Sequence, residues 1–171
     1  MLKLKLFIFK LKNFLILIKS KFKKKRIFFK YKNNKKNFEK LINNKNFSQK
    51  WFLNNFEIFS NYLPKELNKE FSYLEIGSYE GLSALYILSN YPNAKVITVD
   101  LWDESNINSE SLEVNFRKVE KRFDENLKDY KFTKIKKDSV IALRELLKKN
   151  ISFDIIYIDG SHNGCLLYTS D

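Results

Sequence analysis

The segment Leu74-Glu75-Ile76-Gly77-Ser78-Tyr79-Glu80-Gly81 decides the fold of this chain. It begins in a β-rich run, and a predicted helix starts at its end, so it joins a buried strand to a helix. Glycine at Gly77 and Gly81 lets the backbone turn sharply and come close to a ligand. The free N–H groups that open the following helix favour an anion, such as a carboxylate or a phosphate. A strand-to-helix turn without any ligand is the alternative.

Predicted strands and helices alternate around this segment. The expected strands are residues 71–76, 95–100, 132–136 and 153–159. The expected helices are residues 81–90, 111–130 and 139–149. In the helix at 111–130 one apolar face is spaced by three or four residues, and it consists of Leu112, Phe116, Val119, Phe123 and Leu127. This order requires crossover connections, so we expect an α/β fold: a Rossmann-like parallel sheet of about four strands with helices on both faces.

One more helix is expected ahead of the sheet, over residues 47–63. Its apolar side chains lie close to helical spacing at Trp51, Phe52, Phe56, Phe59 and Leu63. Ser48 is the expected N-cap, and Pro64 follows the last residue. We therefore expect a cofactor-binding domain to start at about residue 47 and to run to residue 163.

The positive charge is concentrated at the N-terminus. The chain has a net charge of +12, and residues 1–50 hold 17 of its 32 Lys and Arg residues against the single acid Glu39. We expect residues 1–46 to be a basic, partly disordered extension, with a poorly ordered linker from Phe22 to Asn46. Such a block can neutralise phosphates or anionic lipid headgroups. The alternative is mutational bias, since Lys, Asn, Ile and Phe all have codons rich in adenine and thymine.

The same extension leaves two kinds of partner open. Phe28, Phe29 and Tyr31 lie among the lysines and could stack on bases, which would suit a nucleic-acid-binding protein. Peripheral contact with a membrane surface is also open, although the apolar runs are shorter than a membrane span. Cys165 is the only cysteine, so no internal disulfide can form, and a cytoplasmic location fits.

The turn at residues 77–81 differs from a dinucleotide-binding motif. Nicotinamide and flavin cofactors usually require G-x-G-x-x-G, but Tyr79 occupies the position of the second glycine. Its side chain would block the close backbone approach that a pyrophosphate needs. S-adenosylmethionine has no pyrophosphate and is compatible with this turn.

Polar residues also end the later strands. Asp100, followed by Leu101, ends the second strand, where a carboxylate can accept hydrogen bonds from both hydroxyls of a ribose. Asp138-Ser139 follows the third strand and is a usual place for a residue near an adenine ring. Capping of the next helix is the alternative for Asp100 and for the pair Asp138-Ser139.

The fourth strand ends in Ile158-Asp159-Gly160-Ser161-His162, which holds the only histidine of the chain. Asp159 and His162 are expected at the carboxyl edge of the sheet, beside the reversal of strand order where open α/β sheets bind ligands. The pair could orient an acceptor hydroxyl, accept its proton as catalytic residues, or contribute Asp159 to a Mg²⁺ site. A simple backbone contact is the alternative for His162.

Together these segments resemble class I S-adenosylmethionine-dependent methyltransferases, and in particular the bacterial branch with L-E-I-G-S-x-x-G and D-G-S-H motifs. The likeness covers about residues 47–162 and includes Trp51-Phe52. It implies that residues 75–81 hold the methionine end of the cofactor, Asp100 the ribose and Asp138 the adenine. In relatives Asp159 joins a Mg²⁺ or acceptor site, whose further acidic residues have no counterpart here.

The resemblance also predicts a C-terminal truncation. A complete domain of this family continues for several strands and helices, whereas this chain stops nine residues after His162. Residues 164–171 resemble translated sequencing adapter, so we expect this tail to be non-native. The expected enzyme transfers a methyl group to an unidentified acceptor, with O- or N-methylation of a small molecule favoured. The alternative is a nucleic-acid-binding protein or an RNA methyltransferase that uses the basic N-terminal arm. The fragment itself is expected to be inactive if the rest of the fold is required.

Overall fold

The computed structural model describes residues 34–64, 66, 68–103 and 115–160. The chain divides into two compact units between Leu41 and Ile42, close to the boundary expected at residue 46. Residues 34–42 form a helix within the segment that we expected to be a poorly ordered linker. The aromatic residues proposed to stack on bases, and the expected tail at 164–171, lie outside the described residues.

The second unit is built on a parallel sheet of four strands with the order β3-β2-β1-β4. The strands are β1 (Phe71–Ile76), β2 (Ala94–Asp100), β3 (Thr133–Lys136) and β4 (Ile155–Ile158). The chain moves outward from β1 to β3 and then returns to the other side of β1 for β4. The strand order therefore reverses between β1 and β4, which is where ligands bind in open α/β sheets.

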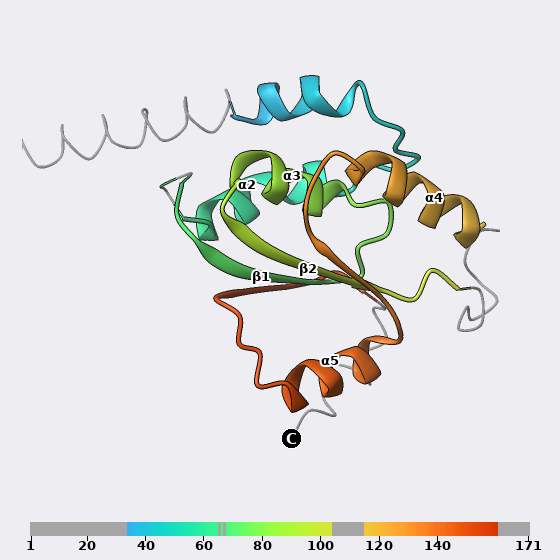
Figure 1. The fold of residues 1–171 in the computed structure, drawn as a ribbon. Helices are drawn as coiled ribbons and strands as arrows, with labels where there is room; N and C mark the ends of the chain where they lie inside the picture. Colours follow the sequence, from blue (N-terminus) through green and yellow to red (C-terminus); the bar gives the residue numbers. More distant parts are fainter. Residues whose placement is uncertain (1–33, 65, 67, 104–114, 161–171) are drawn as a thin grey trace, which may run out of the picture. The chain divides into compact units, whose positions relative to one another are not determined.

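Helices cover both faces of this sheet (Figure 1). They are α2 (Phe52–Tyr62), α3 (Leu82–Asn90), α4 (Phe116–Leu127) and α5 (Ser139–Lys148). Helix α5 lies on one face, and the other three lie on the opposite face. The expected α/β, Rossmann-like fold is confirmed.

The core consists of two layers, because successive side chains of a strand point to opposite faces. On the α5 face, Ala142 and Leu146 pack against Leu74, Ile76 and Val99 of the central strands. On the opposite face the layer is aromatic, and the ring of Phe59 lies 4.9 Å from that of Tyr157 and 6.4 Å from that of Tyr73. The sheet is thereby buried at its centre, where β1 and β2 pair.

Several element boundaries differ from the expected ones. Helix α2 begins at Phe52, not at residue 47, and Trp51 stands at its N-cap without a side-chain cap. Ser48 is not the cap, because its N–H and hydroxyl both donate to Glu80. Helix α4 begins after Asn115, whose side chain accepts from the N–H of Lys118, and residues 128–130 are outside it. In the part of the chain that the structure describes, no helix is both long and apolar enough to cross a bilayer.

Candidate functional site

The turn after β1 brings the ends of β1 and β4 together. Gly77 has a φ of +85°, and a Cβ placed on it would lie 2.4 Å from the carbonyl oxygen of Asp159 and 2.5 Å from Cα of Gly160. The N–H of Asp159 donates to the carbonyl of Ile76 over 2.8 Å. Gly77 is therefore required by the backbone of the neighbouring strand end, in addition to any ligand.

The backbone of Tyr79 is held on both sides. It has a φ of +48°, its N–H donates to Oδ2 of Asp100 over 2.8 Å, and its carbonyl accepts from the indole N–H of Trp102 over 2.8 Å. Its ring lies 5.3 Å from the ring of Trp51, which is 59% exposed. The last residue of β2, Asp100, and Trp102 just after it thus determine the shape of the turn after β1.

Asp100 lies at the end of β2, beside this turn. Its carboxylate accepts from the N–H of Tyr79 and, over 3.1 Å, from the N–H of Trp102. A carboxylate offers about four lone-pair sites, so it has acceptor capacity beyond these two bonds. The alternative that Asp100 caps the next helix does not apply to α4, whose N-cap is Asn115. Leu101, directly after it, is half-buried.

Glu75 is fully buried one residue before the end of β1. The hydroxyl of Tyr73 donates to its Oε2 over 2.8 Å, but Oε1 has no hydrogen-bond partner among the described residues, and neither does the hydroxyl of the buried Ser78. Burial raises the pKa of Glu75 to about 7 and outweighs the opposing effect of the nearby hydroxyls of Tyr73, Ser83 and Ser78. Of these three hydroxyls only that of Tyr73 has hydrogen-bond geometry toward the carboxylate. A buried carboxylate with an unpartnered oxygen is costly, so this site is suited to a donor that the protein does not supply.

Asp159 lies at the end of β4 and is exposed. The hydroxyl of Tyr157 donates to its Oδ2 over 2.9 Å, and Tyr157 is the register partner of Glu75. Burial and then the charge of Asp159 raise the pKa of the Tyr157 hydroxyl above its ordinary range. Tyr73, Glu75, Tyr157 and Asp159 therefore share one face of the β1–β4 pair. Sequence analysis did not predict a role for the two tyrosines. Each stands two residues before one of the carboxylates in the chain, and in a strand this spacing places both side chains on the same face.

Two expected roles at the end of β4 remain predictions, the pairing of Asp159 with His162 and a metal role for Asp159. His162 lies outside the described residues, so the expected pairing with Asp159 stays a prediction. Within the described ranges there is no group of three or more His, Cys, Asp or Glu side chains that could hold a metal. A Mg²⁺ role for Asp159 also stays a prediction.

Asp138 is the N-cap of α5. Its Oδ1 accepts from the N–H groups of Val140 and Ile141, over 2.9 and 3.2 Å, and Ser139 opens the helix. The capping alternative is therefore confirmed for Asp138, and a role near adenine stays a prediction. The N–H of Lys137 donates to the carbonyl of Asp100 over 3.1 Å, so the start of α5 lies beside the end of β2.

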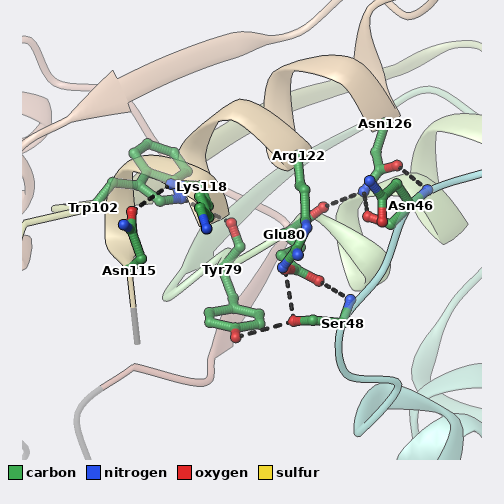
Figure 2. A network of polar contacts seen from close by, with 9 residues as sticks. All are labelled: Asn46, Ser48, Tyr79, Glu80, Trp102, Asn115, Lys118, Arg122 and Asn126. Carbon is green, nitrogen blue, oxygen red and sulfur yellow. Dashed lines mark hydrogen bonds and ion pairs between the residues drawn. The ribbon is translucent and has the colours of Figure 1, made fainter. Parts of the chain in front are cut away.

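A second polar network reaches the turn from the outside, through Glu80 (Figure 2). Glu80 is 1% exposed, and its carboxylate contacts Arg122 of α4 and Ser48 of the segment before α2. The amide of Asn126, one helical turn after Arg122, donates to the carbonyl of Glu80 over 3.1 Å. Sequence reasoning included Glu80 only as a member of the turn, because its partners are remote in the chain.

The structure therefore brings Glu75, Gly77, Ser78, Tyr79, Asp100 and Asp159 together at the carboxyl edge of the sheet. In a comparison with protein families, residues 74–167 match a model described as a methyltransferase domain. The match begins in β1, covers more than half of the chain, and includes residues 164–167 of the tail that we expected to be non-native. No curated protein matches the chain. Because the family model spans β1 to β4 and the turns that join this edge, the chain belongs to the methyltransferase domain family.

Proposed function

We propose that the protein transfers a methyl group from S-adenosylmethionine to an oxygen or nitrogen atom of a small molecule. The family match implies a methyl donor of this type in general. The observation that carries the finer assignment is the meeting of Glu75, the turn at 77–81 and Asp100 at the carboxyl edge of β1 and β2, beside the reversal of strand order between β1 and β4.

The residues at this edge fit the donor in chemical type. The unpartnered Oε1 of buried Glu75 is suited to the ammonium group of a methionine moiety, and the hydroxyl of Ser78 is a second free polar group for the same end. Asp100 has lone pairs left for ribose hydroxyls. Leu101 and Asp138 follow neighbouring strands and are the residues that we assign to the adenine end, with Ser139 beside them.

The chemistry requires little of the protein beyond orientation. When bound, the sulfonium supplies an already activated methyl group. The protein must align an acceptor nucleophile with that group and exclude water. An acceptor hydroxyl would be oriented by Asp159, which Tyr157 holds over 2.9 Å, and its proton would pass to Asp159 or to His162. An already nucleophilic nitrogen would need neither residue as a base.

Calorimetric titration of the 171-residue protein with S-adenosylhomocysteine tests the donor assignment. Asp100→Ala should weaken binding at least tenfold, because a hydrogen bond to a charged group is worth about 1.5–3 kcal/mol. Asp124→Ala is the control, since Asp124 lies on α4 with its side chain 56% exposed and pairs with Lys134. Absence of binding by the unmodified protein at millimolar ligand would reject the proposal.

The acceptor class requires a separate measurement. Labelled methyl transfer from S-adenosylmethionine into small-molecule, RNA and protein fractions should place the label in the small-molecule fraction. Label found only in RNA would favour the RNA methyltransferase alternative that the basic N-terminus suggested.

A further inference from the structure

We infer that Glu80 and Arg122 are positioning residues, which hold the turn at 77–81 in the shape that binds the methyl donor. This inference rests on the proposed function, because it concerns the same turn. It assigns a role to the ion pair between the buried Glu80 and the half-buried Arg122, which contacts neither Glu75 nor Asp100. Through Glu80 this pair joins the turn to α4 and to the segment before α2 (Figure 2).

Both carboxylate oxygens of Glu80 are engaged. Oε2 accepts from the backbone N–H of Ser48 over 2.6 Å. Oε1 accepts from the hydroxyl of Ser48 over 2.7 Å and from Nη1 of Arg122 over 2.7 Å. A carboxylate that is 1% exposed requires such charge-assisted donors, and these three restrict it to one orientation.

Helix α4 approaches the same turn at two further points. Asn126 donates to the carbonyl of Glu80, and it also accepts from the N–H of Asn46 over 2.9 Å and donates to its carbonyl over 3.1 Å. A Cβ on Gly81 would lie 2.9 Å from Leu127 and 3.0 Å from Phe123, so α4 packs directly on the end of the turn. The outer side of the turn is therefore shaped by α4 and by residues 46–48.

The inner side of the turn is held independently, from β2. Asp100 binds the N–H of Tyr79, and Trp102 binds its carbonyl. Glu80 is the next residue, so consecutive peptide groups are fixed from opposite sides. If the Glu80–Arg122 pair is broken, the Glu80 carboxylate loses one of its three donors, and the outer side restrains the turn less firmly. Tyr79 in this turn has a φ of +48°, which is unfavourable for a residue with a Cβ. The turn should then adopt other conformations, and binding must select the competent one.

The test compares single changes in the full chain. Arg122→Met removes the cation but keeps an apolar stem, and Glu80→Gln gives the side chain an N–H₂ group where an acceptor is needed. Lys121→Met is the matched control, because Lys121 precedes Arg122 on the same helix and its side chain is 77% exposed. The dissociation constant for S-adenosylhomocysteine is measured by calorimetry, below the melting temperature of each variant.

Arg122→Met and Glu80→Gln should each raise the dissociation constant roughly tenfold, as expected for loss of a charge-assisted bond. The double variant should be no weaker than either single variant, since both remove one interaction. Lys121→Met should bind as the unmodified protein does. A residue that only stabilises the fold would lower the melting temperature but leave the dissociation constant of the folded protein unchanged.

Milder changes keep the test decisive if those variants do not fold. Ser48→Ala removes one donor of three, and Arg122→Lys keeps the charge but loses the planar guanidinium. Each should weaken binding roughly threefold, as for a partial loss of hydrogen bonding. Binding equal to that of the unmodified protein in all folded variants would overturn the inference. Failure of the unmodified protein to bind would reject the proposed function instead.

Discussion

Replacement of Glu75 by glutamine should stabilise the protein at alkaline pH while it weakens binding of the methyl donor. Glu75 is fully buried, and only its Oε2 is hydrogen-bonded, by Tyr73. Glutamine has almost the same shape and cannot ionise, so the variant removes the cost of a buried negative charge. It also removes the carboxylate charge that we propose binds the ammonium group of the methyl donor.

The magnitude follows from the pKa of Glu75, which burial raises from an ordinary 4.5 to about 7. Below pH 4.5 the carboxyl is protonated in both the folded and the unfolded chain, and no stability is lost. Between pH 4.5 and 7 the unfolded chain releases the proton while the folded chain retains it, so the free energy of unfolding falls as pH rises. Above pH 7 the loss is complete and amounts to about 3 kcal/mol, because each unit of pKa is worth about 1.4 kcal/mol.

Urea unfolding at pH 4.5 and pH 8 measures this effect. The free energy of unfolding of Glu75→Gln, relative to that of the unmodified protein, should rise by about 3 kcal/mol from pH 4.5 to pH 8. Any effect of the amide group on stability that is independent of pH cancels in this comparison. Glu57→Gln is the control, because Glu57 is exposed on α2. A difference that is the same at both pH values would refute the reasoning, and so would unchanged affinity of the variant for S-adenosylhomocysteine.

Three further changes test the tertiary contacts. Gly77→Ala should destabilise the fold by several kcal/mol in urea unfolding. A φ of +85° costs about 1–2 kcal/mol for a residue with a Cβ, and the added atom would lie 2.4 Å from the carbonyl oxygen of Asp159. Stability near that of the unmodified protein would contradict the close approach of β4. Asp138→Ala should cost about 1 kcal/mol through loss of the α5 N-cap, and a weaker affinity for S-adenosylhomocysteine would support its adenine role. Asn126→Asp should destabilise the fold by several kcal/mol at neutral pH and by less at acid pH, because it places a negative charge against the buried carbonyl of Glu80. A loss of melting temperature, relative to the unmodified protein, that is the same at both pH values would count against this prediction.

The order and type of the elements were predictable because they depend on local pattern. The run Phe71–Ile76 is a strand with the expected bounds, and α3 begins one residue after the expected start. Alternation of strands and helices then restricted the sheet to a parallel arrangement, because parallel strands need crossover connections. Proximity of Gly77 and Asp100 followed from the same rule, since the carboxyl ends of parallel strands meet at one edge.

Contacts between side chains remote in the sequence were decided only by the tertiary structure. Glu80 pairs with Arg122, 42 residues later, and with Ser48, 32 residues earlier, so Ser48 binds the turn instead of capping α2. Similarly, Gly77 is required because the backbone of Asp159 and Gly160 passes directly beside it. The periodicity of apolar residues indicates which face of an element a side chain occupies, but not which residue it contacts there. The contact partners depend on how the elements pack against the sheet, and this packing determines which residues hold the turn at 77–81.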